Sequence, residues 1–159
     1  MRRICLAALV SLAAGCGVQP SGVMDAGPAP TGVAPGVTLY FLDDHDRLRP
    51  QLRQSGQLGT IAEALSLLLT GPGPTDLHTD LPTDAETRVP VQTTPELIRL
   101  WVPWTIADVP PLGIDQIVCT ALGVHVQAGG STSTRVQVRF TLPTPESDEQ
   151  RTCPLISAR

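Results

Sequence analysis

From residue 37 onward the hydrophobic and polar positions follow regular patterns, which predict a series of short elements. Residues 37–42 (VTLYFL) are rich in β-forming side chains and predict a strand, which ends at the turn-prone cluster Asp43–Asp46. Residues 47–57 are polar, contain a proline and a glycine, and predict no regular element.

Two segments show the periodicity of helices that pack on one side. The first begins at a capping box, Thr60 with Glu63 three residues later, and ends at Gly71 and Pro72. The second is expected to end at Gly123. The apolar positions of the two stripes are Ile61, Ala64, Leu65, Leu68 and Leu69, and then Ile114, Ile117, Val118, Ala121 and Leu122.

Three further segments alternate with the period of a strand. Val89 and Val91 predict a short strand, which Pro90 restricts to a sheet edge or a bulge. Residues 97–102 predict a strand with two faces, formed by Ile98, Leu100 and Val102 and by Leu97, Arg99 and Trp101. The last strand also has two faces, formed by Val136, Val138, Phe140 and Leu142 and by Arg135, Gln137, Arg139 and Thr141.

The elements therefore follow the order β-α-β-β-α-β. Two amphipathic helices can cover one face of a small twisted sheet, so the sequence predicts an α+β fold that forms a two-layer sandwich. Both helices are expected on the same face of the sheet. The strands are half polar, and the opposite face is expected to meet water or a partner.

The N-terminus predicts export. Residues 1–3 include two arginines and residues 4–14 carry no charge, which is typical of a secretory signal and too short to span a bilayer. The run ends LAAGC, where small residues before Cys16 resemble a bacterial lipobox. That resemblance implies cleavage before Cys16 and a diacylglyceryl group on its thiol. The alternative is an ordinary signal peptide, in which Cys16 is not lipidated.

These signals divide the chain into three parts. Residues 1–15 are interpreted as a lipoprotein signal peptide, residues 16–36 as the lipidated cysteine with a tether, and residues 37–159 as one domain with a C-terminal tail. The tether has five glycines and four prolines in residues 17–36 and no apolar stripe. The protein is expected on the extracytoplasmic face of the cell membrane, where several acyl chains on one cysteine give stable anchoring.

Composition and charge narrow the range of partners. The formal net charge is −4, and it becomes −6 when Arg2 and Arg3 leave with the signal peptide. An acidic protein of this kind lacks the basic surface that nucleic-acid binding requires, so no nucleic-acid partner is expected. Aromatic residues make up only 3% of the chain, which predicts a lean core.

The cysteines predict one disulfide bond. Cys5 leaves with the signal and Cys16 takes lipid, so Cys119 and Cys153 remain as two thiols in an exported protein. Their bond would close a loop of about 35 residues, and it would contribute roughly 3–4 kcal/mol in the chain-entropy model. The alternative is two separate thiols, one of them buried.

Four motifs together resemble a GerMN domain, named after a spore germination and sporulation protein. They are the strand 37–42 followed by two aspartates, ALSLLLTGP at 64–72, LPT at 81–83, and QIVCTAL at 116–122. Their combination is similar to single-domain lipoproteins of high-GC Gram-positive bacteria. The resemblance implies a non-catalytic module outside the cytoplasm, similar to the ring-building domains of secretion and sporulation assemblies. It transfers no catalytic residue.

No residue cluster predicts catalysis, a metal or a cofactor. The cluster Asp43–Asp46, which contains His45, lacks the spacing of a calcium loop and is interpreted as a turn with solvated charges. His78 with Asp80 is interpreted as polar surface, and His125 has no evident partner. An enzyme that acts on cell-wall polymers through an unrecognised carboxylate pair is the alternative function.

Trp101 and Arg99 are the candidate contact residues for a partner. They share the face of their strand that lies opposite the apolar one, and both residue types are enriched in binding hot spots. The alternative is that Trp101 packs under the proline-rich segment 103–111, while Trp104 is expected on the core side. The sequence thus predicts a lipid-anchored, non-catalytic binding or assembly module that contacts an envelope protein or the cell wall.

Overall fold

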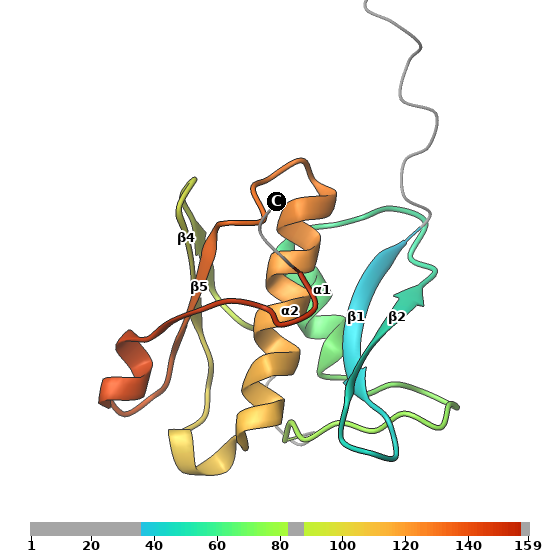
Figure 1. Cartoon of the computed structure of the whole chain (residues 1–159), viewed down its shortest axis with the longest axis horizontal. Helices are drawn as coiled ribbons and strands as arrows, with labels where there is room; N and C mark the ends of the chain where they lie inside the picture. The colour runs from blue at the N-terminus through green and yellow to red at the C-terminus, as the bar shows by residue number, and fades with distance from the viewer. Residues whose placement is uncertain (1–35, 83–87, 157–159) are drawn as a thin grey trace, which may run out of the picture. The chain divides into compact units, whose positions relative to one another are not determined.

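Helix α2 (Pro111–Gln127) lies between two small β-sheets in the computed structural model, which describes residues 36–82 and 88–156. All described residues belong to one compact unit, Gly32–Arg159. Strands β1 and β2 lie on one side of α2, and β4 and β5 lie on the other (Figure 1). Helix α1 (Ile61–Leu68) packs against both α2 and β1. The α+β class with two helices is confirmed.

The first sheet is a hairpin of β1 (Val37–Leu42) and β2 (Leu48–Arg53). Strand β1 is buried almost throughout and matches the predicted strand. Strand β2 was not predicted, because its residues are mostly polar and it contains Pro50, opposite Tyr40. A proline is tolerated there because β2 is an edge strand, and an edge strand leaves half of its backbone groups unpaired.

The second sheet has four strands in the order β3-β4-β5-β6. They are β3 (Val91–Thr93), β4 (Leu97–Trp101), β5 (Arg135–Arg139) and β6 (Gln150–Arg151). Strands β4 and β5 are parallel and the other pairs are antiparallel. A parallel pair needs a crossover connection, and α2 supplies it between β4 and β5.

The prediction of a single sheet therefore needs correction. Strand β1 pairs with β2 rather than with β4 or β5, and it packs against α2. The long helix is buried on nearly all sides, since every residue from Gly113 to Val124 except Asp115 is buried. Because α2 is buried on several faces, it packs against both sheets instead of covering only one face of a single sheet.

Helix α1 begins and ends as the sequence predicts. The Thr60 hydroxyl accepts a hydrogen bond from the Glu63 amide at 3.2 Å, and the Glu63 carboxylate accepts one from the Thr60 amide at 2.7 Å. The hydrogen bonds that the Thr60 amide and hydroxyl donate to this carboxylate lower the pKa of Glu63. Gly71 follows the helix with a φ of +79°, a left-handed conformation that glycine adopts without strain.

Gly123 does not end α2, contrary to the prediction. The helix continues to Gln127, and Gly123 lies inside it against Tyr40 of β1. A Cβ atom at position 123 would lie 3.2 Å from Cε2 of Tyr40. The glycine therefore permits close packing between the helix and the strand, and helix termination is not its role.

The last predicted strand is shorter than expected. Strand β5 ends at Arg139, and Leu142 is 61% exposed rather than part of an apolar face. Phe140 is buried, and the Thr141 amide donates to the Trp104 carbonyl at 2.9 Å. The chain leaves the sheet at this point and continues into a short helical turn, η2 (Pro145–Asp148).

A disulfide joins Cys119 of α2 to Cys153, and the two Cα atoms are 4.7 Å apart. Both side chains lie in the core. The bond holds the C-terminal segment, which contributes only the two-residue strand β6, against the central helix. The predicted cysteine pairing thus agrees with the structure.

Among the described residues, no helix is both long enough and apolar enough to cross a bilayer.

Candidate functional site

The outward face of the four-stranded sheet brings both predicted contact residues together. On β4, Ile98 and Leu100 are fully buried, while Arg99 is half-buried and Trp101 is 42% exposed. Alternation along the strand produces this difference, because successive side chains point to opposite faces. The prediction that Arg99 and Trp101 share the non-core face is confirmed.

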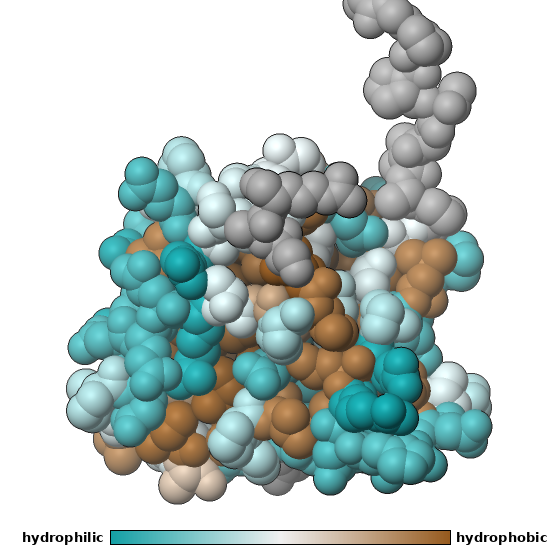
Figure 2. Space-filling model, viewed as in Figure 1, coloured by the Kyte–Doolittle hydropathy of each residue, from teal (hydrophilic) through white to brown (hydrophobic). Residues whose placement is uncertain are grey.

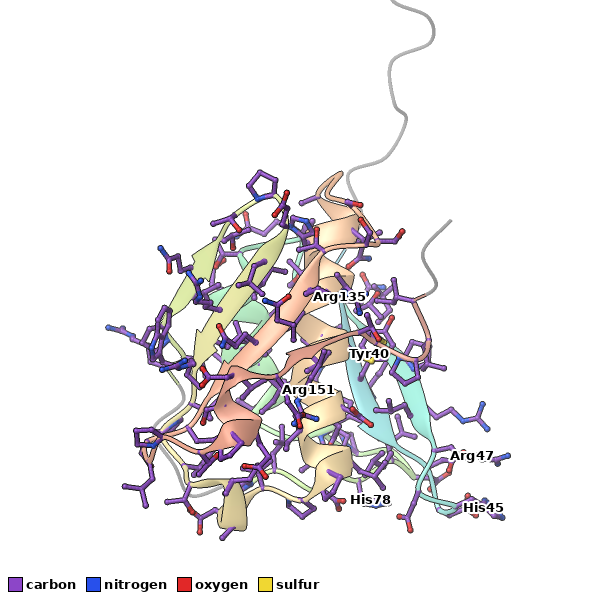
Figure 3. All side chains as sticks on the ribbon, turned by 60° about the vertical axis from the view of Figure 1, so that its left-hand side comes forward. Tyr40, His45, Arg47, His78, Arg135 and Arg151 are labelled. Atoms are coloured by element: carbon purple, nitrogen blue, oxygen red, sulfur yellow. A yellow bond between two sulfur atoms is a disulfide. The ribbon has the colours of Figure 1, made fainter. Side chains whose placement is uncertain are left out.

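Strand β5 adds a second row of polar side chains to this face. In the parallel register Arg99 lies beside Gln137 and Trp101 lies beside Arg139. Arg135, at the start of β5, is exposed on the same face. Figure 3 shows Arg135 on the sheet side of α2, away from the hairpin. We call the face formed by Gln92, Arg99, Trp101, Arg135, Gln137 and Arg139 the outer sheet face.

Hydrogen bonds connect the three strands β3, β4 and β5 and the helical turn η2 across the outer sheet face. The Arg99 guanidinium donates through Nε to Gln137 Oε1 at 3.1 Å and through Nη1 to Gln92 Oε1 at 3.3 Å. Gln137 Nε2 then donates to Asp148 Oδ1 at 3.4 Å, and Arg139 Nη1 donates to the same oxygen at 2.5 Å. These bonds hold the Arg99 and Arg139 side chains in place.

The two tryptophans differ in their exposure. Trp104 is only 6% exposed and belongs to the core, as predicted. Trp101 is among the most exposed large apolar side chains of the described residues. Trp101 therefore keeps a large accessible surface, unlike Trp104.

The outer sheet face is cationic, although the chain as a whole is acidic. Its charged side chains are Arg99, Arg135 and Arg139, and Asp148 lies at its border. Hydrophilic residues cover the side of the molecule where β4 and β5 lie, while hydrophobic residues gather over α2 (Figure 2). Such a face is suited to an acidic partner surface, which an exposed tryptophan can contact through its large apolar ring.

The sequence did not indicate the whole outer sheet face, because its side chains meet only through the pairing of the strands. Alternation in residues 135–141 separates Arg135, Gln137 and Arg139 from the apolar positions, so a local signal for them exists. Nothing in that pattern shows that β5 lies beside β4 in parallel register. Gln92 and Asp148 join the network only through tertiary structure.

The turn at Asp43–Asp46 connects β1 to β2 and lies at the hairpin tip, where Figure 3 places His45 and Arg47. Ligand atoms of Asp43, Asp44 and His45 lie within 4.8 Å of one another. Asp43 Oδ1, however, accepts from the amides of His45 and Arg47, both at 3.0 Å. This bonding closes the turn, with Asp46 at a φ of 55°.

Two arginines complete the surroundings of the Asp43 carboxylate. Oδ2 accepts from Arg47 Nε at 3.2 Å and from Arg49 Nε at 2.8 Å. Desolvation raises the pKa of Asp43, but the hydrogen bonds from Arg47, Arg49 and His45 outweigh it and hold the pKa well below its usual range. A carboxylate bound to two guanidinium groups is poorly suited to a cation, and the geometry is that of a structural turn.

The other histidines have structural partners. His78 and Leu42 exchange two backbone hydrogen bonds of 2.9 Å, and the His78 ring lies 3.4 Å from the Asp46 carboxylate. His125 Nε2 lies 3.1 Å from the Thr134 hydroxyl, which donates to the Pro95 carbonyl at 2.9 Å. His78 therefore connects its loop to β1 and to the hairpin turn, and His125 connects α2 to the segment before β5.

Cys16, the predicted lipidation site, lies outside the described residues. Comparison with known proteins identifies no relative: no family model matches the chain, and neither a curated protein nor a solved structure matches it. The resemblance to GerMN domains stays a prediction that depends on the sequence motifs alone.

Proposed function

We propose that this protein is a lipid-anchored extracytoplasmic lipoprotein whose domain is a non-catalytic binding module for another envelope protein. The N-terminal signal, the LAAGC run with Cys16 and the Gly/Pro-rich tether support export and anchoring. The GerMN-like motifs support an assembly role outside the cytoplasm. In this proposal the tether extends the domain away from the membrane and the outer sheet face contacts the partner.

One observation carries the proposal, namely the exposed Trp101 within a hydrogen-bonded set of arginines. Tryptophan and arginine are the side chains that most often dominate binding free energy. Side chains that are already fixed lose less conformational entropy on binding, and Gln137 and Asp148 fix Arg99 and Arg139. The cationic charge of this face favours an acidic surface on the partner.

Substitution of the two contact residues tests this function. Trp101→Ala and Arg99→Ala are each expected to lower partner recovery from solubilised membranes at least tenfold, since each removes a hot-spot side chain. Leu52→Ala is the matched control, because Leu52 is an exposed apolar side chain on the hairpin, on the other side of α2. Recovery is measured by quantitative mass spectrometry after affinity capture of the tagged full-length protein.

Folding of each variant is checked by thermal unfolding. The change is expected to stay below about 0.5 kcal/mol for Leu52→Ala, and to be about 1 kcal/mol for Trp101→Ala and Arg99→Ala, whose side chains are partly buried. Unchanged recovery by both folded variants would remove the outer sheet face from the proposal. Recovery of cell-wall fragments in place of a protein would assign the same face to the wall.

A further inference from the structure

A groove of about 1030 Å³ lies between helix α1 and the outer edge of strand β3. Its apolar lining includes Ile61 and Leu67 of α1, Val91 of β3, and Val89 in the segment just before β3. Ile61, Leu67 and Val91 are partly buried against the core, so each keeps an exposed apolar surface toward the groove. The groove thus offers apolar contact area along one side of a sheet edge.

The backbone of β3 is unpaired on the side away from β4. The Pro90 carbonyl accepts from the Trp101 amide at 3.1 Å, and the Thr94 amide donates to the Leu97 carbonyl at 2.9 Å. In an antiparallel pair every second residue bonds to the neighbouring strand, so the N–H and C=O groups of Val91 and Thr93 point away from β4. Within residues 36–82 and 88–156 no strand pairs with this edge of β3.

An arginine lies on each side of this edge. Arg88 is exposed at the groove and makes no ion pair with any other described residue. Glu63 also lines the groove and stays ionised, because its carboxylate accepts hydrogen bonds from Thr60 in the helix cap. On the opposite face of the sheet, Arg99 lies beside Gln92 of β3.

We propose that the β3 edge binds an extended segment of the partner protein by strand addition, and that acidic and apolar residues alternate in this segment. Its backbone would pair with the free groups of Val91 and Thr93. Successive side chains of an added strand point to opposite faces, so apolar ones enter the groove over α1 and acidic ones reach the side of Arg99. This inference rests on the proposed function, because it states how the same partner is held.

Photocrosslinking of the full-length protein in its own cells tests this inference. A benzoylphenylalanine residue in place of Thr93, which is exposed at the groove, is expected to form one major adduct with the partner. Val91→Pro removes an outward N–H and is expected to lower adduct yield at least fivefold. Val91→Thr keeps that N–H and a branched side chain, and is expected to leave the yield unchanged.

Ala62→Phe provides a second variant, because Ala62 lines the groove from α1 and a larger ring would fill it. It is expected to lower the yield as Val91→Pro does, so the test holds even where the proline variant does not fold. Mass spectrometry of the adduct should identify an acidic, alternating segment of the partner.

The same crosslinker at position 135, which is exposed on the outer sheet face, separates this inference from the proposed function and leaves Trp101 in place. Adducts from position 135 without adducts from position 93 would overturn strand addition and leave the outer sheet face as the binding site. A yield from position 93 that neither Val91→Pro nor Ala62→Phe changes would also overturn it, as would a basic crosslinked segment. Absence of adducts from both positions would overturn the inference together with the proposed function.

Discussion

Replacing both Cys119 and Cys153 by Ala is expected to lower the free energy of unfolding by about 3 kcal/mol. The two residues are 34 positions apart, and their bond removes conformational entropy from the unfolded chain in proportion to the logarithm of the loop length. For a domain of this size the corresponding fall in Tm is roughly 10 °C. The bond also holds β6, which has only two residues, so the C-terminal segment loses its attachment to α2.

Two measurements check this expectation. Denaturant unfolding of the double-alanine variant gives the change in free energy, and the wild-type protein in reducing agent should show a loss of similar size. Hydrogen exchange should show the greatest loss of protection in β6 and in the segment around residue 153. A variant that unfolds within about 0.5 kcal/mol of the wild type would contradict this role of the bond.

Gln116→Ala is expected to destabilise the domain by about 3 kcal/mol, a similarly large effect. Gln116 is fully buried on α2, and its Nε2 donates to the Tyr40 carbonyl of β1 at 3.1 Å. Its Oε1 accepts from the Asp80 amide at 3.0 Å and from the Thr79 hydroxyl at 3.3 Å. One amide therefore connects the central helix to the hairpin and to a long loop.

The large effect follows from the groups that the substitution leaves behind. The Tyr40 carbonyl and the Asp80 amide would lose a partner in an environment that water reaches poorly, and this costs more than the bonds themselves contribute. Gln127→Ala is the matched control on the same helix, because Gln127 is exposed and donates to the Thr38 hydroxyl at the surface. It is expected to change the unfolding free energy by less than about 0.5 kcal/mol in the same denaturant experiment.

Local patterns in the sequence predicted the elements that have a strong signal of their own. The capping box at Thr60 and Glu63 gave the start of α1, and alternation at residues 97–101 gave both faces of β4. Strand β2 has no such signal, because its side chains are mostly polar and it is recognised only by its pairing with β1. The rule that a glycine often ends a helix fails at Gly123. This glycine lies inside α2, where the Tyr40 ring occupies the space that a side chain would need.

The candidate site was likewise predicted only where a local sequence pattern exists. Trp101 and Arg99 were found from the sequence because strand alternation places them opposite two buried side chains. Their partners Gln137 and Arg139 lie 38 residues further along the chain and meet them only through the parallel pairing of β4 with β5. No local pattern in the sequence indicates that β4 pairs with β5. The groove at β3 was missed for the same reason, because it requires α1 and the sheet edge to meet.

Crosslinking in the cell, with the tagged full-length protein in its own membrane, addresses anchoring and partner binding together. Cys16→Ser is the control, because it removes the proposed lipid and leaves the domain unchanged. The wild-type protein is expected in the membrane fraction with specific adducts, and the Cys16→Ser protein in the soluble fraction without them. A wild-type protein that forms no adducts while anchored, or a Cys16→Ser protein that stays in the membrane with the same adducts, would contradict the proposal of a lipid-tethered binding module.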